Sequence, residues 1–122
     1  MENLISGDLK IELTAADPAA PIQMMWRGKS NDRTPSKILG PYFATILASA
    51  IERRVPVELH FERIDHFNSS TITAVIQLIQ DARTANIKLV LVYDKALKWQ
   101  KLSFDALRVF VRDDQQLELR SV

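Results

Sequence analysis

The chain has 122 residues, of which 47% are hydrophobic and 25% are charged. This length and balance fit a single globular domain over 1–122, and most of the chain is expected to be ordered. A formal net charge of +1 lacks the basic excess of nucleic-acid-binding proteins, so no nucleic-acid partner is expected. The absence of cysteine excludes disulfides, thiol catalysis and cysteine metal sites.

The apolar stretches of the sequence are all shorter than the ~20 residues that cross a bilayer. Residues 1–9 do not show the signal-peptide pattern, a cationic segment followed by an apolar run. We therefore expect a cytoplasmic protein without a membrane partner.

Alternating apolar and polar side chains predict the first two strands, at 9–13 and 22–27. The segment between them is too short for a crossover helix, so the two strands are expected to pair antiparallel. A turn-rich connection follows over 28–40, with a short helical turn at 35–39.

The first long helix is expected to begin at Pro41. The Gly40-Pro41 pair disfavours helical backbone before the proline, which itself suits the first helical position. The apolar stripe of this helix runs over 42–51, and Arg53 in its last turn suits the helix dipole.

The middle of the chain alternates between strand and helix. A strand is predicted at 57–61, and 64–70 links it to an amphipathic helix over 72–82. Asn86 is expected to close this helix in a left-handed conformation, before a strand at 87–93.

Two short helices and a last strand are expected at the end of the chain. Asp94 is expected to cap a helix that runs to Leu102, and Ser103 to cap another that contains Leu107. Alternation over 117–120 predicts the fifth strand.

These elements predict an α/β fold with a mixed five-stranded sheet. Nearly every strand has one apolar and one polar face, which indicates a two-layer sandwich with the helices mainly on one face of the sheet. The strand at 87–93 differs, because Val90 and Val92 indicate a central strand or a small apolar patch on the second face. The polar faces of the other strands carry Lys10, Glu12, Gln23, Arg27, Glu58, His60, Glu62, Glu118 and Arg120.

The segment 65–71 is the most informative for function. It enters a helix at the carboxyl edge of the expected sheet, where open α/β sheets place ligand and regulatory sites. A phosphate on a hydroxyl there would add about −1.5 to −2 charge beside the positive end of the helix. The simpler interpretation is that Asn68 or Ser69 only caps the helix.

The order of elements and the run Phe67-Asn68-Ser69-Ser70-Thr71 resemble the STAS domain of anti-sigma-factor antagonists. The run also resembles the STAS-like regulatory phosphoproteins of biofilm kinase/phosphatase switches. In the anti-sigma-factor antagonists, the helix follows a four-residue motif. Its positions are Asp, then Ser, then either Ser or Thr, and finally Gly. Asn68 stands here in place of the acid and Thr71 in place of the glycine.

The resemblance implies a regulatory protein-binding domain of a partner-switching pathway, and not an enzyme. Its implied partners are a serine kinase that is also an anti-sigma factor and a serine/threonine phosphatase. Ser69 matches the phosphorylated serine, with Ser70 and Thr71 as alternates. The expected partner-binding residues are Asp65, His66, Asn68, Ser70 and Thr71.

Other chemistry is less well supported by the sequence. His66 and Ser69 lack the glycines of a nucleophile elbow. His60 between Glu58 and Glu62 offers metal-ligand types, but a solvated sheet face explains the three side chains more simply. No cofactor or metal is expected.

Two alternative functions remain open from the residues. One is a non-phosphorylated interaction or assembly module, in which the open sheet face or a sheet edge forms a homodimer. The other is a small-ligand binder or enzyme with its site near Asp65, His66 and Ser69.

Overall fold

The computed structural model describes residues 2–15 and 17–122, and over these it contains a seven-stranded sheet, three α-helices and a 3₁₀ helix. The strands are β1 (Leu4–Ser6), β2 (Leu9–Thr14), β3 (Ile22–Ser30), β4 (Val57–His60), β5 (Ile64–Phe67), β6 (Leu89–Tyr93) and β7 (Leu117–Ser121). The helices are α1 (Ser36–Arg53), α2 (Ser69–Thr84), α3 (Lys98–Ala106) and the 3₁₀ helix η1 (Leu107–Phe110).

The sheet is mixed, with strand order β1-β2-β3-β4-β6-β7. The first three strands pair antiparallel, and β3, β4, β6 and β7 pair parallel. Beyond the end of β4, β5 pairs parallel with the last residues of β3. The predicted α/β class and the antiparallel pairing of the first two expected strands, which are β2 and β3, are therefore confirmed.

The prediction of five strands is wrong, because β1 and β5 were not expected. β1 has only three residues, too few for a pattern of alternation. β5 lies within the predicted link 64–70, and its two exposed residues stand next to each other between two buried ones. Neither strand carries the period-two signal on which strand prediction depends.

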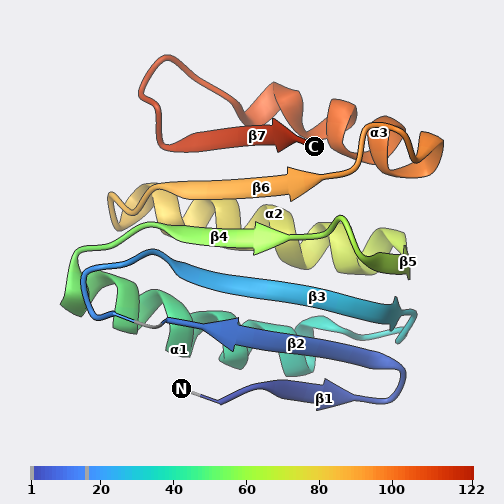
Figure 1. Ribbon diagram of the computed structural model, residues 1–122, viewed down its shortest axis with the longest axis horizontal. Helices are drawn as coiled ribbons and strands as arrows, with labels where there is room; N and C mark the ends of the chain where they lie inside the picture. Colours follow the sequence, from blue (N-terminus) through green and yellow to red (C-terminus); the bar gives the residue numbers. More distant parts are fainter. Residues whose placement is uncertain (1, 16) are drawn as a thin grey trace.

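The helices lie on one side of the sheet. In Figure 1 the strands face the viewer, α1 and α2 run behind them, and no helix of the described residues lies in front. The predicted two-layer architecture is confirmed. The core between the layers includes an aromatic cluster in which the ring centroids of Trp26 and Phe61 are 4.8 Å apart and those of Phe61 and Phe104 are 5.2 Å apart.

The face of the sheet without helices is polar around a small apolar centre. Val90 and Val92 of β6 are each only 2% exposed, although no helix covers them. β6 lies between β4 and β7, and longer polar side chains stand beside both valines in the neighbouring strands. The stems of these side chains shield the valines from water, which confirms the prediction of a central strand.

α1 begins at Ser36, five residues before the expected start at Pro41. Pro41 lies inside the helix, where it removes one main-chain hydrogen bond. Gly40 before it has no Cβ, which relieves much of the clash that proline imposes on its predecessor. Leu39 is 1% exposed in the early part of the helix, so burial of this side chain offsets the cost of the proline.

The two helices expected after Asp94 are one α-helix followed by a 3₁₀ turn. α3 starts at Lys98, and the Asp94 carboxylate instead accepts a hydrogen bond from the Ala96 N–H in the preceding turn. Ser103 lies inside α3, where its hydroxyl donates to the Trp99 carbonyl. The expectation that Ser103 caps a helix is therefore wrong.

Asn86 has a φ of 58° after α2, which confirms the predicted left-handed conformation. In the part of the chain that the structure describes, no helix is both long and apolar enough to span a bilayer.

Candidate functional site

The candidate site lies where β3 and β5 end and α2 begins. Figure 1 shows β5 at the edge to which the arrowheads of the parallel strands point. The N–H of Asn68 donates to the Ser30 carbonyl over 3.0 Å, so the start of α2 is held against the end of β3. The predicted position of the segment 65–71 at the carboxyl edge of the sheet is therefore confirmed.

Asn68 caps α2 with its side chain. Its Oδ1 accepts hydrogen bonds from the N–H of Thr71 over 2.9 Å and from the hydroxyl of Thr71 over 2.8 Å. Its Nδ2 donates to the carbonyl of Asp32 over 2.7 Å, which ties the cap to the loop between β3 and α1. Of the two expected capping residues, Asn68 is the one that fills this role.

Thr71 is completely buried, with 0% of its surface exposed. Its hydroxyl lies 2.7 Å from the Ser30 hydroxyl, which is also buried. Thr71 was expected as an alternate phosphoacceptor and as a partner-binding residue, but its buried side chain is not accessible to a kinase or a partner. Through this hydroxyl, the first turn of α2 contacts the end of β3 in the interior.

The hydroxyls of Ser69 and Ser70 have a different environment. Ser69 is the first residue of α2 and is exposed, while Ser70 is half-buried. Ser70 faces a groove between α2 and the loop before α1. The groove is lined by Arg33, Thr34, Pro35, Ser36, Ser70, Thr73, Ala74 and Gln77.

Asp65 and His66 are exposed on β5, next to the start of α2. The buried Phe67 beside them packs edge-on against Trp99, with 5.1 Å between ring centroids. The His66 ring lies 6.3 Å from the same tryptophan. This contact brings α3 to the same edge of the molecule as the candidate site.

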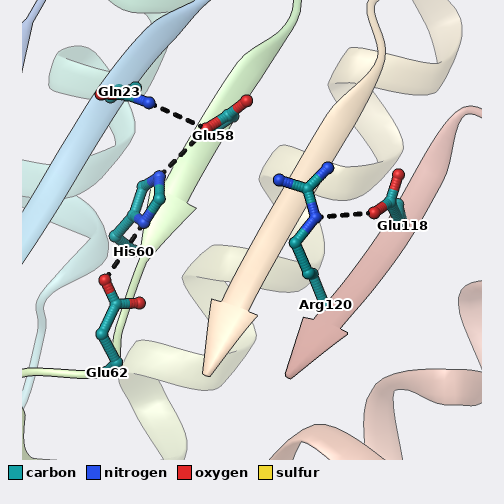
Figure 2. A network of polar contacts seen from close by, with 6 residues as sticks. All are labelled: Gln23, Glu58, His60, Glu62, Glu118 and Arg120. Atoms are coloured by element: carbon teal, nitrogen blue, oxygen red, sulfur yellow. Dashed lines mark hydrogen bonds and ion pairs between the residues drawn. The ribbon is translucent and has the colours of Figure 1, made fainter. Parts of the chain in front are cut away.

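A second polar cluster lies on the open face of the sheet, away from α2 (Figure 2). The two ring nitrogens of His60 are 3.0 Å from a Glu58 oxygen and 3.1 Å from a Glu62 oxygen. Gln23 donates to the same Glu58 oxygen over 3.1 Å.

Each of these side chains contacts another member of the cluster. Among the residues that the structure describes, no group of three or more histidine, aspartate or glutamate side chains is placed to hold a metal ion. In the cluster, His60 contacts both Glu58 and Glu62 on the polar face of the sheet.

On β7, Arg120 Nε contacts Glu118 Oε2 over 2.9 Å, and Lys88 Nζ lies 3.2 Å from Glu118 Oε1 (Figure 2 shows the first of these pairs). Both contacts hold the pKa of the Glu118 carboxyl below its usual value, and the hydrogen bond from Arg120 has the larger effect.

No pattern in the sequence pointed to Ser30 or to the Asp32 carbonyl. Ser30 lies 41 positions before Thr71 and contacts it through the fold. Every residue has a main-chain carbonyl, so the residue type at position 32 does not predict this contact. Only the adjacency of β3 and β5 brings these groups to α2.

The fold has counterparts among solved structures. No known protein-family model matches the chain, and no curated protein matches its sequence. One structural match is a chain in the crystal structure of the diguanylate cyclase SiaD in complex with its activator SiaC from Pseudomonas aeruginosa. It has a TM-score of 0.67 and 15% identity, and the alignment covers 98% of both chains.

A second match is the Bacillus cell fate determinant SpoIIAA in its phosphorylated form. The TM-score is 0.57 at 12% identity, and the alignment covers 92% of this chain and 90% of that chain. Both alignments span nearly the whole chain. The chain therefore has a STAS-like fold.

Proposed function

We propose that the protein is a regulatory protein-binding domain of a partner-switching pathway, controlled by reversible phosphorylation of Ser69 at the start of α2. It acts by binding and not by catalysis. The observation that carries the proposal is the contrast between neighbouring hydroxyls. Ser69 is exposed at the positive end of a helix, whereas Thr71 is buried and bonded to Ser30.

The rigid base beneath Ser69 supports this proposal. Asn68 holds the first turn of α2 through its contacts with Thr71 and with the Asp32 carbonyl. A kinase needs an accessible hydroxyl, and a partner needs a surface of constant shape around it. The main-chain N–H groups of Ser69 and Ser70 lie at the helix start, where the positive end of the helix dipole stabilises an added phosphate.

The structural likenesses support a regulatory role of this kind. SpoIIAA was solved in a phosphorylated form, and SiaC is described as the activator of SiaD with which it forms a complex. By analogy, the partners of this chain are a serine kinase of the anti-sigma-factor type, a serine/threonine phosphatase and the protein that the switch controls.

The switch is electrostatic. In the unphosphorylated state, a partner protein docks on Asp65, His66, Ser69 and Ser70, which lie together at the edge of the sheet. Phosphorylation adds about −1.5 to −2 charge in the middle of this surface. A docked partner would have to desolvate that charge, so phosphorylation weakens binding, while α2 tolerates the phosphate at its N-terminus.

The test is a comparison of variants in partner capture from cells that naturally express the protein. Ser69→Ala should retain the partner, and Ser69→Asp should lose most of it. Thr73→Asp is the matched control, because Thr73 is exposed on the same helix, one turn further on. Equal capture by the two Ser69 variants would rule out this switch.

A non-switching binding module is the second candidate. It is favoured by the completeness of the Asn68 cap, which satisfies the Thr71 N–H without any phosphate. In that case the partner is bound in every growth condition, and neither Ser69 variant changes its capture.

A further inference from the structure

The outer edge of β7 has a regular pattern of main-chain polar groups. β7 pairs with β6 on one side, and over 2–15 and 17–122 no strand pairs with its other side. The Gln116 carbonyl accepts from the Leu89 N–H, and the Val122 N–H donates to the Tyr93 carbonyl. Main-chain polar groups alternate in direction along a strand, so those of Leu117, Leu119 and Ser121 point away from β6.

The side chains of β7 carry charge in a self-complementary order. Glu118 and Arg120 lie on the open face of the sheet (Figure 2), beside Val90 and Val92 of β6. Suppose that two copies of β7 pair antiparallel about Leu119. Glu118 of each copy then stands opposite Arg120 of the other, and Leu119 stands opposite Leu119.

The hydrogen-bond pattern fits this register as well. The Leu119 pair would exchange both main-chain hydrogen bonds, as would each pair of Leu117 and Ser121, because these residues point outward. The Glu118–Arg120 pairs then fall at the non-hydrogen-bonded positions, where side chains of antiparallel strands come closest. Arg120 uses its Nε within its own chain, so the remaining guanidinium N–H groups are available to the second copy.

We infer that the occupant of the β7 edge is a second copy of this chain, which pairs its own β7 antiparallel about Leu119 and joins the two sheets into one. The opposite edge of the sheet is less suited to such pairing. β1 has three residues and contains no charged side chain that could define a register. The inference is independent of the proposed phosphorylation at Ser69.

The dimer should be weak and dependent on concentration, because a pairing of five-residue strands is small for an interface. Single substitutions of opposite charge, Glu118→Arg or Arg120→Glu, place like charges opposite each other twice per dimer. Each should weaken association roughly tenfold in sedimentation equilibrium. The double variant with both changes exchanges the charges and should restore association, which separates an interface effect from a folding effect.

The absence of cysteine from the chain allows a test of the register. With Leu119→Cys, two antiparallel copies bring the Cα atoms of position 119 to about 5.5 Å, within the range of a disulfide. With Ser121→Cys, the equivalent atoms are roughly 13 Å apart along the paired strands, so no disulfide forms in this register. Ser121 is exposed, which makes it a matched control.

The expected result is a covalent dimer on mild oxidation of the Leu119→Cys variant, and none with Ser121→Cys. A wild-type protein that sediments as a monomer at every concentration would overturn the inference. A dimer that cross-links equally through positions 119 and 121 would also overturn it. The same holds for a dimer whose affinity is unchanged by the single charge substitutions, because such a dimer would use another surface.

Discussion

The Ser30 and Thr71 hydroxyls meet over 2.7 Å in the interior, at the base of the proposed switch. Both side chains are almost fully buried, so neither hydroxyl can exchange its partner for water. The Thr71 hydroxyl also lies 2.8 Å from the Asn68 Oδ1. A single buried oxygen thus holds the end of β3, the cap and the first turn of α2 together.

Thr71→Val tests this junction, because valine keeps the shape of threonine and removes the hydroxyl. The Ser30 hydroxyl would lose its partner inside the core, so we expect a loss of about 1–3 kcal/mol in the free energy of unfolding. Urea denaturation measures it. Thr73→Val is the control and should change stability by less than about 0.5 kcal/mol, since Thr73 is exposed. Equal losses in the two variants would contradict a special role for the buried hydroxyl.

At this scale, the sequence could indicate the candidate site but not its contacts. The capping residue before α2 was among those expected, because capping depends on residues three positions apart. The burial of Thr71 depends on Ser30, which belongs to a distant strand. A single sequence does not show which distant strand a helix start contacts.

At the scale of elements, α1 shows how burial overrides a local signal. Pro41 and Gly40 both disfavour helix, yet α1 runs through them and buries Leu39, Phe43 and Ile46 on one face. Strands with clear alternation, such as β2 and β3, were predictable from period alone. β1 and β5 were not, since each is short and owes its place to its neighbours.

Pro41→Ala should stabilise the protein by about 1–2 kcal/mol, because it restores a main-chain hydrogen bond inside α1. Gly40→Ala should add about 0.5–1 kcal/mol only when Pro41 is also replaced. A Cβ at position 40 meets no other part of the fold, but it clashes with the ring of a following proline. Thermal unfolding of the two single variants and the double variant measures this coupling, and additive effects would contradict it.

Asp114 links the segment before β7 to α2. Its carboxyl accepts a hydrogen bond from the Gln116 N–H and pairs with Arg83. Both contacts lower the pKa of Asp114, and the hydrogen bond from Gln116 has the larger effect. A carboxyl with a lowered pKa in the folded state contributes stability above its unfolded pKa. That contribution is lost as the pH falls through its folded pKa.

Asp114→Asn should therefore reduce stability at neutral pH and make it less dependent on pH in acid. Below the folded pKa of Asp114, the two proteins should approach equal stability. Urea denaturation at neutral and acidic pH measures both effects. A constant difference between the two proteins at all pH values would show that the ionised form of Asp114 contributes nothing.

For the whole molecule, the sheet has one face covered by helices and one face that is polar and open (Figure 1). This asymmetry was visible in the sequence, because nearly every strand alternates between apolar and charged side chains. It leaves three surfaces: the edge around Ser69, the cluster around His60 and the outer edge of β7. We assign the first to a regulated partner and the third to a second copy of the chain.

The proposed switch requires that Ser69 carries a phosphate in the cell. The most direct measurement is the intact mass of the protein isolated from cells that naturally express it, with and without phosphatase treatment, followed by peptide mapping. We expect the added mass of one phosphate, its removal by the phosphatase and its location on Ser69. An unmodified mass in every growth condition, or a phosphate on any residue outside the start of α2, would contradict the proposed switch.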